Sequence, residues 1–126
     1  MTQDFQRIPE VAAVVIGKVG DEPTFPFPEV LDVIRLCSAN GIAVLGVELF
    51  RVKQDGHYAA GSSAYDTQHG KRWRSLQDSQ WQDYVQYNNT LAEEFARKNP
   101  LGEDHVYVLT TASWVEFREL QKTKAL

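Results

Sequence analysis

The sequence predicts an α+β domain, in which helices pack on a small mixed or antiparallel sheet with a central hairpin. The first observation is the run Gly41–Tyr58, GIAVLGVELFRVKQDGHY, where a β-branched strand leads into Asp55-Gly56, a pair typical of a type I′ turn. The second is helical periodicity on both sides of this hairpin, over residues 28–40 and 79–98. At 126 residues the chain is long enough for one core, so we expect a single domain, 1–126.

Three segments precede the hairpin. Pro9–Val19 can open as a short helix, but the valines that follow favour extended structure, so we expect an extended or mixed element. Gly20–Phe27 is rich in proline and carries two phenylalanines, which predicts an ordered extended segment laid over the core. Pro28 suits the first position of a helix, with Cys37 on its apolar stripe and Asn40-Gly41 as its end.

The predicted central strand contains one anomaly, the carboxylate of Glu48. Both faces of Ile42–Val52 are apolar along most of their length, so we expect a strand that is covered on both sides. Alternation places Glu48 on the same face as Val44. A bare buried carboxylate is costly, so Glu48 needs a hydrogen-bonding partner or a route to water. If the loop has two residues, Glu48 lies opposite Ser63, whose hydroxyl group can donate to it.

Two further elements follow the hairpin. The returning strand starts at Tyr58 and is expected to become irregular near Gly61, because the residues there are small and polar. Ser79 and Gln82 have capping-box spacing, which predicts a long helix that continues to Lys98.

The C-terminal region combines a strand and a short helix. Asp104–Thr111 alternates cleanly, with Val106, Val108 and Thr110 expected on one face. Ser113 and Glu116 then form a second capping-box pattern, which opens the last helix.

The long helix has a face that mixes aromatic rings with amides. That composition, in Trp81, Tyr84, Tyr87, Asn88 and Asn89, is typical of protein recognition. The alternative is ordinary core packing for the rings, with the asparagines on a solvated flank.

Asn88 occupies a position on the apolar stripe of the long helix where a hydrophobic residue is expected. A buried amide there must hydrogen-bond to something, and Glu48, Asp66 and Thr110 are the candidates.

Composition argues against several classes of function. The formal net charge of −4 disfavours nucleic acid and anionic membrane as partners, and no apolar stretch is long enough to cross a bilayer. The polar N-terminus lacks a secretory pattern, and Cys37 is the single cysteine, so we expect a cytoplasmic protein. The histidines follow no metal-ligand spacing and no phosphate or dinucleotide motif occurs, so we predict no metal and no cofactor.

The residues offer little basis for catalysis. Cys37 lies in an apolar helical stripe, where a neutral thiol is inert. Glu48 can be interpreted as a satisfied structural carboxylate, as a charge in a partner-binding groove, or as a general base. Catalysis is the least favoured of these interpretations, because the sequence places no second catalytic group beside it.

Several short motifs occur together: GIAVLGVELF after a helix, DG at the turn, SSAYD, a helix with W..Y and NN..A, and YVLTTASWVEF. Together, over roughly residues 26–120, they resemble the small immunity proteins of bacterial polymorphic-toxin systems. The resemblance implies a cytoplasmic α+β protein without catalysis, which occludes the active site or substrate surface of a cognate toxin. Some of those families carry GG and an Asp after the leucine, whereas here Gly46 is followed by Val47 and Glu48.

We therefore predict an immunity protein that inhibits its toxin by stoichiometric binding. The predicted contact residues are Glu48, Tyr65, Asp66, Tyr87, Asn88 and Asn89. One alternative is a small-molecule-binding domain or small enzyme, with a pocket around Glu48 and the Trp81 helix. Another is a subunit of a larger complex that uses Phe25 and Phe27.

Overall fold

The computed structural model describes residues 4–53, 58–66, 76–98 and 105–124, and the fold is α+β, as predicted. In chain order the elements are η1 (Asp4–Arg7), α1 (Pro9–Ala12), β1 (Gly17–Val19), β2 (Glu22–Thr24), α2 (Glu29–Ala39), β3 (Ala43–Val52), β4 (Tyr58–Asp66), η3 (Asp78–Gln80), α3 (Trp81–Lys98), β5 (His105–Ala112) and α4 (Trp114–Lys124).

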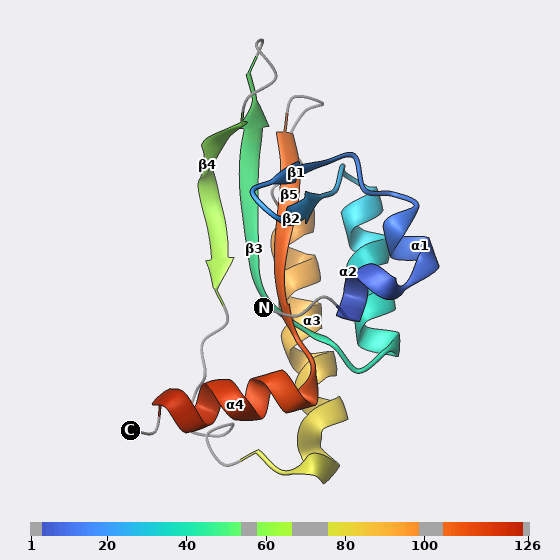
Figure 1. Cartoon of the computed structure of the whole chain (residues 1–126), viewed down its shortest axis with the longest axis vertical. Coiled ribbons are helices and arrows are strands. Elements are labelled where there is room, and N and C mark those ends of the chain that lie inside the picture. The colour runs from blue at the N-terminus through green and yellow to red at the C-terminus, as the bar shows by residue number, and fades with distance from the viewer. Residues whose placement is uncertain (1–3, 54–57, 67–75, 99–104, 125–126) are drawn as a thin grey trace.

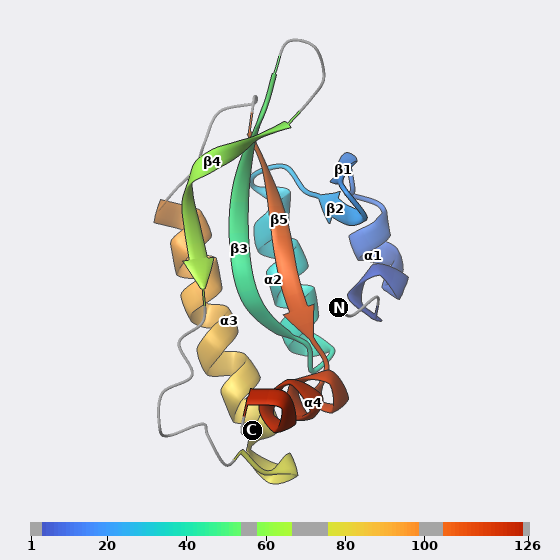
Figure 2. The ribbon, with the colours of Figure 1, turned by 60° about the vertical axis from the view of Figure 1, so that its left-hand side comes forward.

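β3 is the centre of a three-stranded antiparallel sheet with the order β4-β3-β5 (Figure 1). β1 and β2 pair with each other in a separate two-stranded hairpin near β5. α2 and α3 lie behind the larger sheet, and α4 crosses its lower end (Figure 2). The predicted central strand and its antiparallel return are therefore confirmed, while the Asp55-Gly56 turn lies outside the described residues.

The N-terminal segment is mixed, with the short helix α1 followed by β1. The β1–β2 turn contains Gly20, whose φ of 60° lies in the left-handed region that glycine tolerates. The next residues form the expected segment over the core. Phe25 is fully buried, its N–H donates to the Tyr107 carbonyl at 2.9 Å, and the Tyr107 N–H donates back to the Phe25 carbonyl at 2.8 Å.

α2 starts directly after Pro28 and ends where the sequence predicts. Its buried stripe consists of Val30, Val33, Ile34 and Cys37. Gly41 has a φ of 67°, so the chain leaves the helix through a left-handed residue and enters β3 almost at once.

Buried apolar residues form two clusters, one on each side of the sheet. The helix-side core lies among the sheet, α1, α2 and the second half of α3, and consists of Val11, Phe25, Val30, Val33, Ile34, Cys37, Ile42, Val44, Val47, Leu49, Ala92, Ala96, Tyr107 and Leu109. The aromatic core lies near α4 and the start of α3, and consists of Ala43, Leu45, Leu76, Trp81, Tyr84, Val85, Ala112 and Phe117.

Trp81 is the hub of the aromatic core. Its ring centroid lies 5.5 Å from that of Tyr84, 5.2 Å from that of Trp114 and 5.2 Å from that of Phe117. Such spacings are typical of attractive aromatic pairs. For Trp81 and Tyr84 the structure therefore confirms ordinary core packing, the alternative to an exposed recognition surface.

β3 contains a bulge at Leu45 relative to β5. Val44 lies opposite Thr111 and Gly46 lies opposite Thr110, so the residue between Val44 and Gly46 has no counterpart on β5. An inserted residue of this kind shifts the alternation of side chains by one.

The bulge reverses the predicted orientation of Glu48. Val44 belongs to the helix-side core, but so do Val47 and Leu49, which places Glu48 on the opposite face. Glu48 is exposed. The prediction that Glu48 shares a face with Val44 in a strand covered on both sides is wrong, because regular alternation does not continue through a bulge.

β4 is irregular near Gly61, as predicted. Phe50 lies opposite Ala60 and Glu48 lies opposite Ala64. Between these two pairs β4 has three residues, 61–63, where β3 has only one. The predicted pairing of Glu48 with Ser63 is wrong for this reason, since it assumed an unbroken ladder.

α3 is preceded by the 3-10 turn η3, so the N-terminal cap lies at Gln77 and not at the predicted Ser79. The Gln77 N–H donates to Gln80 Oε1 at 3.0 Å, and these two residues form the capping box. The predicted box of Ser79 and Gln82 is wrong, because the chain begins to coil two residues earlier.

α4 begins with the capping box that the sequence predicts. The Ser113 N–H donates to Glu116 Oε1 at 3.1 Å, and the Glu116 N–H donates to Ser113 Oγ at 3.3 Å. The Trp114 indole N–H donates to the Asp78 carboxylate. The Arg118 guanidinium lies 5.6 Å from the Trp114 ring centroid, a cation–π distance. α4 is therefore tied to the turn before α3.

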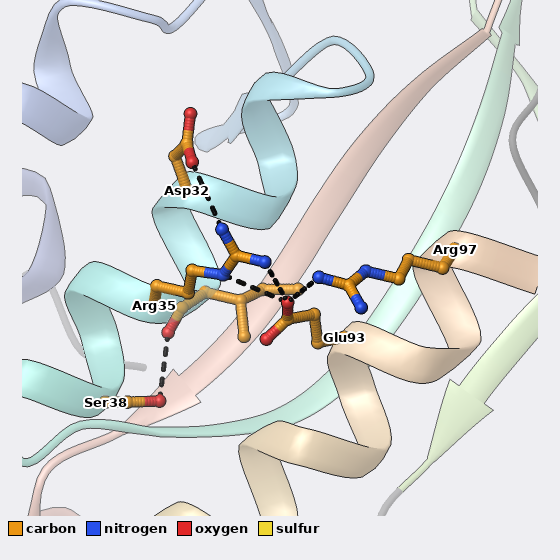
Figure 3. A network of polar contacts seen from close by, with 6 residues as sticks. Asp32, Arg35, Ser38, Glu93 and Arg97 are labelled. Atoms are coloured by element: carbon orange, nitrogen blue, oxygen red, sulfur yellow. Dashed lines mark hydrogen bonds and ion pairs between the residues drawn. The ribbon is translucent and has the colours of Figure 1, made fainter.

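An ion-pair network joins α2 to α3 (Figure 3). Arg35 donates to Glu93 Oε1 through Nε at 3.0 Å and Nη2 at 2.7 Å, and Arg97 Nη2 donates to the same oxygen at 2.6 Å. The hydrogen bond with Glu93 raises the pKa of Arg35, and the negative charge of Glu93 raises it further. This network fixes the spacing of two helices and has no evident chemical role.

Candidate functional site

The six predicted site residues separate by exposure. Tyr87 is 50% exposed and Glu48 is exposed, whereas Asn88 is 2% and Asn89 is 1% exposed. The remaining two, Tyr65 and Asp66, lie in β4 opposite Val47 and Gly46, and their side chains lie outside the described part of the structure.

Asn88 and Asn89 form what we call the amide clamp on the edge of β3. Asn89 Oδ1 accepts from the Val44 N–H at 2.7 Å, and Asn89 Nδ2 donates to the Ile42 carbonyl at 2.9 Å and to Ser38 Oγ at 2.9 Å. Asn88 Nδ2 donates to the Val44 carbonyl at 2.6 Å. Both backbone groups of Val44 are thus bound by side chains of α3.

The clamp takes the place of a neighbouring strand. The last pair between β3 and β4 is Gly46 with Asp66, so among the described residues no strand reaches this edge of β3 at Ile42–Val44. A carboxamide carries both donors and an acceptor and can replace the ladder of a missing strand. These buried bonds leave neither asparagine available at the surface, which corrects their prediction as partner contacts.

The predicted hydrogen-bond partners of Asn88 were also wrong. It bonds to a main-chain carbonyl instead of to Glu48, Asp66 or Thr110, because the unpaired backbone of β3 is closer and must be satisfied.

Two more α3 side chains, missed at the sequence level, support the same connection. Trp81 Nε1 donates to the Gly41 carbonyl at 2.7 Å, and Gln82 Nε2 donates to the Ser38 carbonyl at 3.1 Å. Trp81 and Gln82 precede Asn88 and Asn89 by seven residues, or about two helical turns, so the four side chains share one side of α3. This seven-residue spacing is the feature of the sequence that could have predicted their shared role.

A second group of carboxylates lies near the exposed side of β3. Glu22 is half-buried in β2, and burial raises its pKa from the ordinary value of 4.5. The positive charge of the N-terminus lowers this pKa, whereas the negative charges of Asp21 and Glu48 raise it. The charge of Glu48 acts on Glu22 although the two residues belong to different sheets. We call Asp21, Glu22 and Glu48 the acidic patch.

No ion pair in the described part of the structure involves the acidic patch. The ion pairs found there use Asp32 and Glu93 as their carboxylates. Glu22 and Glu48 thus form no ion pair within the described residues, and the positive charge of the N-terminus opposes the effect of Asp21 and Glu48 on the pKa of Glu22. Sequence reasoning found Glu48 but missed Glu22, because no sequence pattern brings β2 towards β3.

Tyr87 lies on an exposed stripe of α3. Asp83, Thr90 and Glu94 are also exposed, and they lie four residues before, three after and seven after Tyr87. These spacings put the four residues on one side of the helix. We call them the outer stripe, in which two carboxylates flank a tyrosine and a threonine.

Two polar groups near the predicted pocket, Glu48 and Asn88, do not converge. Asn88 is bound to the backbone of Val44, whereas Glu48 lies four residues further along β3 and is exposed. Cys37 is buried, and burial raises the pKa of its thiol to about 12, so it remains protonated and unreactive, as predicted. No cluster of three metal-ligating side chains occurs within the described residues.

Comparison with known protein families, with curated proteins and with solved structures found no match to this chain. Across the described residues, no helix has both the length and the apolar character needed to span a bilayer.

Proposed function

We propose that this chain is an immunity protein of a bacterial polymorphic-toxin system, which acts in the cytoplasm and inhibits a cognate toxin by stoichiometric binding. The acidic patch is the observation that carries the proposal. The negative charges of Asp21 and Glu48 disfavour the ionised form of Glu22, and a partner that presents lysine or arginine relieves that repulsion. The site thus suits a basic protein surface.

The outer stripe provides a second contact surface of the same character. Tyrosine is enriched among the residues that dominate binding energy, because it offers a large contact area at low entropic cost. Tyr87 lies between the carboxylates of Asp83 and Glu94, which suit a basic partner. The net charge of −4 favours encounter with such a partner through electrostatic steering.

The interior is consistent with a rigid binding body. The amide clamp and Trp81 direct their polar atoms at the backbone of the chain, which holds the α2–β3 connection in one conformation. A preorganised surface binds more tightly, since less conformational entropy is lost on association. The motif resemblance to immunity proteins supports the same function.

Co-expression with the product of the neighbouring gene tests the proposal. We expect this chain to rescue cells from that product and to purify with it in equimolar amounts. Glu48→Lys should weaken the complex at least about tenfold at low salt, while the free energy of unfolding stays within about 0.5 kcal/mol of wild type.

Glu10→Lys is the matched control, because Glu10 is an exposed glutamate on α1 that does not belong to the acidic patch. It makes the same charge change and should leave affinity intact. Failure to rescue, or an unchanged affinity for Glu48→Lys, contradicts the proposal.

A further inference from the structure

The two outer edges of the larger sheet differ in their backbone hydrogen bonding. The outer edge of β5 is bridged by Phe25, which exchanges two backbone hydrogen bonds with Tyr107. The outer edge of β4 has no strand paired with it in the described part of the chain (Figures 1 and 2). One edge of the sheet is thus bridged at Tyr107 by another part of the chain, and within the described residues no strand pairs with the other edge.

β4 lacks most of the features that normally block an edge. It is nine residues long, compared with a mean of about five to six for strands, and its sequence is YAAGSSAYD. It contains no proline and carries no charge before its last residue, Asp66. Soluble proteins usually protect exposed edges with charge, proline or shortness, and here only the bulge near Gly61 is present.

We propose that the outer edge of β4 accepts an extended segment of the toxin, which adds a strand to the sheet through main-chain hydrogen bonds. This inference rests on the proposed function and specifies how the partner docks. Strand addition obtains affinity from the backbone, so it suits an edge whose central residues, 59–64, are small and uncharged.

The net charge of the chain favours a toxin segment, and not a second copy of this chain, as the strand that pairs with the outer edge of β4. Pairing two copies through β4 would bring together two bodies of net charge −4. Glu48 lies on β3 directly opposite Ala64 of β4, so an added strand would lie about 10 Å from it, two strand spacings away. A lysine or arginine on the added strand can reach Glu48 across that distance.

Amide hydrogen exchange on the chain, free and in complex with the co-expressed neighbouring gene product, tests the inference. We expect the amides of β4 that point away from β3 to become at least about tenfold more protected in the complex. The amides of α2 serve as the internal reference and should not change.

Proline substitutions at Ala59 and Ala60 provide a matched pair, because adjacent residues of a strand direct their N–H groups to opposite edges. One proline removes a bond to β3 and lowers the stability of the fold. The other removes an outward N–H, retains stability and should weaken the complex at least about tenfold. If both proline variants unfold, amide hydrogen exchange on the wild-type complex alone tests whether β4 pairs with the toxin.

A complex that forms without added protection of β4 overturns this inference and leaves the proposed function standing. If no complex forms, both are overturned. Protection of β4 in the free chain that depends on concentration identifies a second copy as the occupant, and contradicts the assignment to the toxin.

Discussion

Two stretches of the same strand use polar groups in opposite ways. At Ile42–Val44 the polar side chains of α3 are buried and bound to the backbone, and at Glu48 a carboxylate is exposed beside another carboxylate without an ion pair in the described structure. The bulge at Leu45 separates the two stretches. The difference shows that a polar residue in an apolar pattern is either bound within the fold, as Asn88 and Asn89 are, or exposed at the surface, as Glu48 is, where we propose that it contacts a partner.

The largest expected effect comes from the buried stretch. Asn89→Ala removes the partners of the Val44 N–H and the Ile42 carbonyl, both in a buried environment. An unsatisfied buried group costs about 1–3 kcal/mol, so we expect a loss of about 2–4 kcal/mol in the free energy of unfolding, measured in urea.

Thr90→Ala is the control for that measurement. Thr90 is the next residue of α3, but it is exposed and bonds only within its own helix, to the Gln86 carbonyl. Its replacement should change stability by less than about 0.5 kcal/mol. A similarly small effect for Asn89→Ala would show that the amide clamp does not hold β3.

An increase in the free energy of unfolding is expected from a substitution on β5, opposite the buried stretch of β3. Thr111 lies opposite Val44 and is buried, but its hydroxyl finds no hydrogen-bond partner in the described part of the structure. Thr111→Val keeps the shape and removes the unsatisfied group, so stability should rise by about 1 kcal/mol. The same substitution at the half-buried Thr110 should give no such gain, and a loss at Thr111 would mean that its hydroxyl is bound.

The smallest effect concerns the acidic patch and depends on pH. The pKa of Glu22 is raised in the folded state, so its contribution to stability is fully present below its ordinary pKa of 4.5 and is lost as the pH rises through the folded value. At pH 7 the ionised carboxylate therefore destabilises the fold. Glu22→Gln should raise the free energy of unfolding by less than about 0.5 kcal/mol at pH 7.

At pH 4 that gain should disappear, because the wild-type carboxyl group is then largely protonated in both states. Unfolding curves for the two proteins at both pH values give the comparison. A gain that is equal at pH 4 and pH 7 would show that the charge of Glu22 is not the cause.

Much of the fold could be predicted from local patterns. The α+β class, the central strand, the exit from α2 through Gly41 and the capping box at Ser113 all depend on residues that are close in sequence. The need of Asn88 for a hydrogen bond was also predictable, since an amide on an apolar stripe must be satisfied.

The orientation of Glu48 was not predictable from the strand alone. It depends on the bulge at Leu45, which arises between strands far apart in the chain. Because one extra residue reverses every later side chain, an error at a single position changed the predicted environment of the main candidate residue. The proximity of Glu22 was missed for a similar reason, since β2 and β3 belong to different sheets.

The central claim is that the two stretches of β3 have separate roles, and one paired measurement tests it most directly. Affinity for the neighbouring gene product and the free energy of unfolding are measured together for Asn89→Ala and Glu48→Lys, at a temperature where both variants are folded. We expect Asn89→Ala to lose stability and keep its affinity, and Glu48→Lys to keep its stability and lose affinity. If the two quantities fall together in both variants, the separation of roles is contradicted.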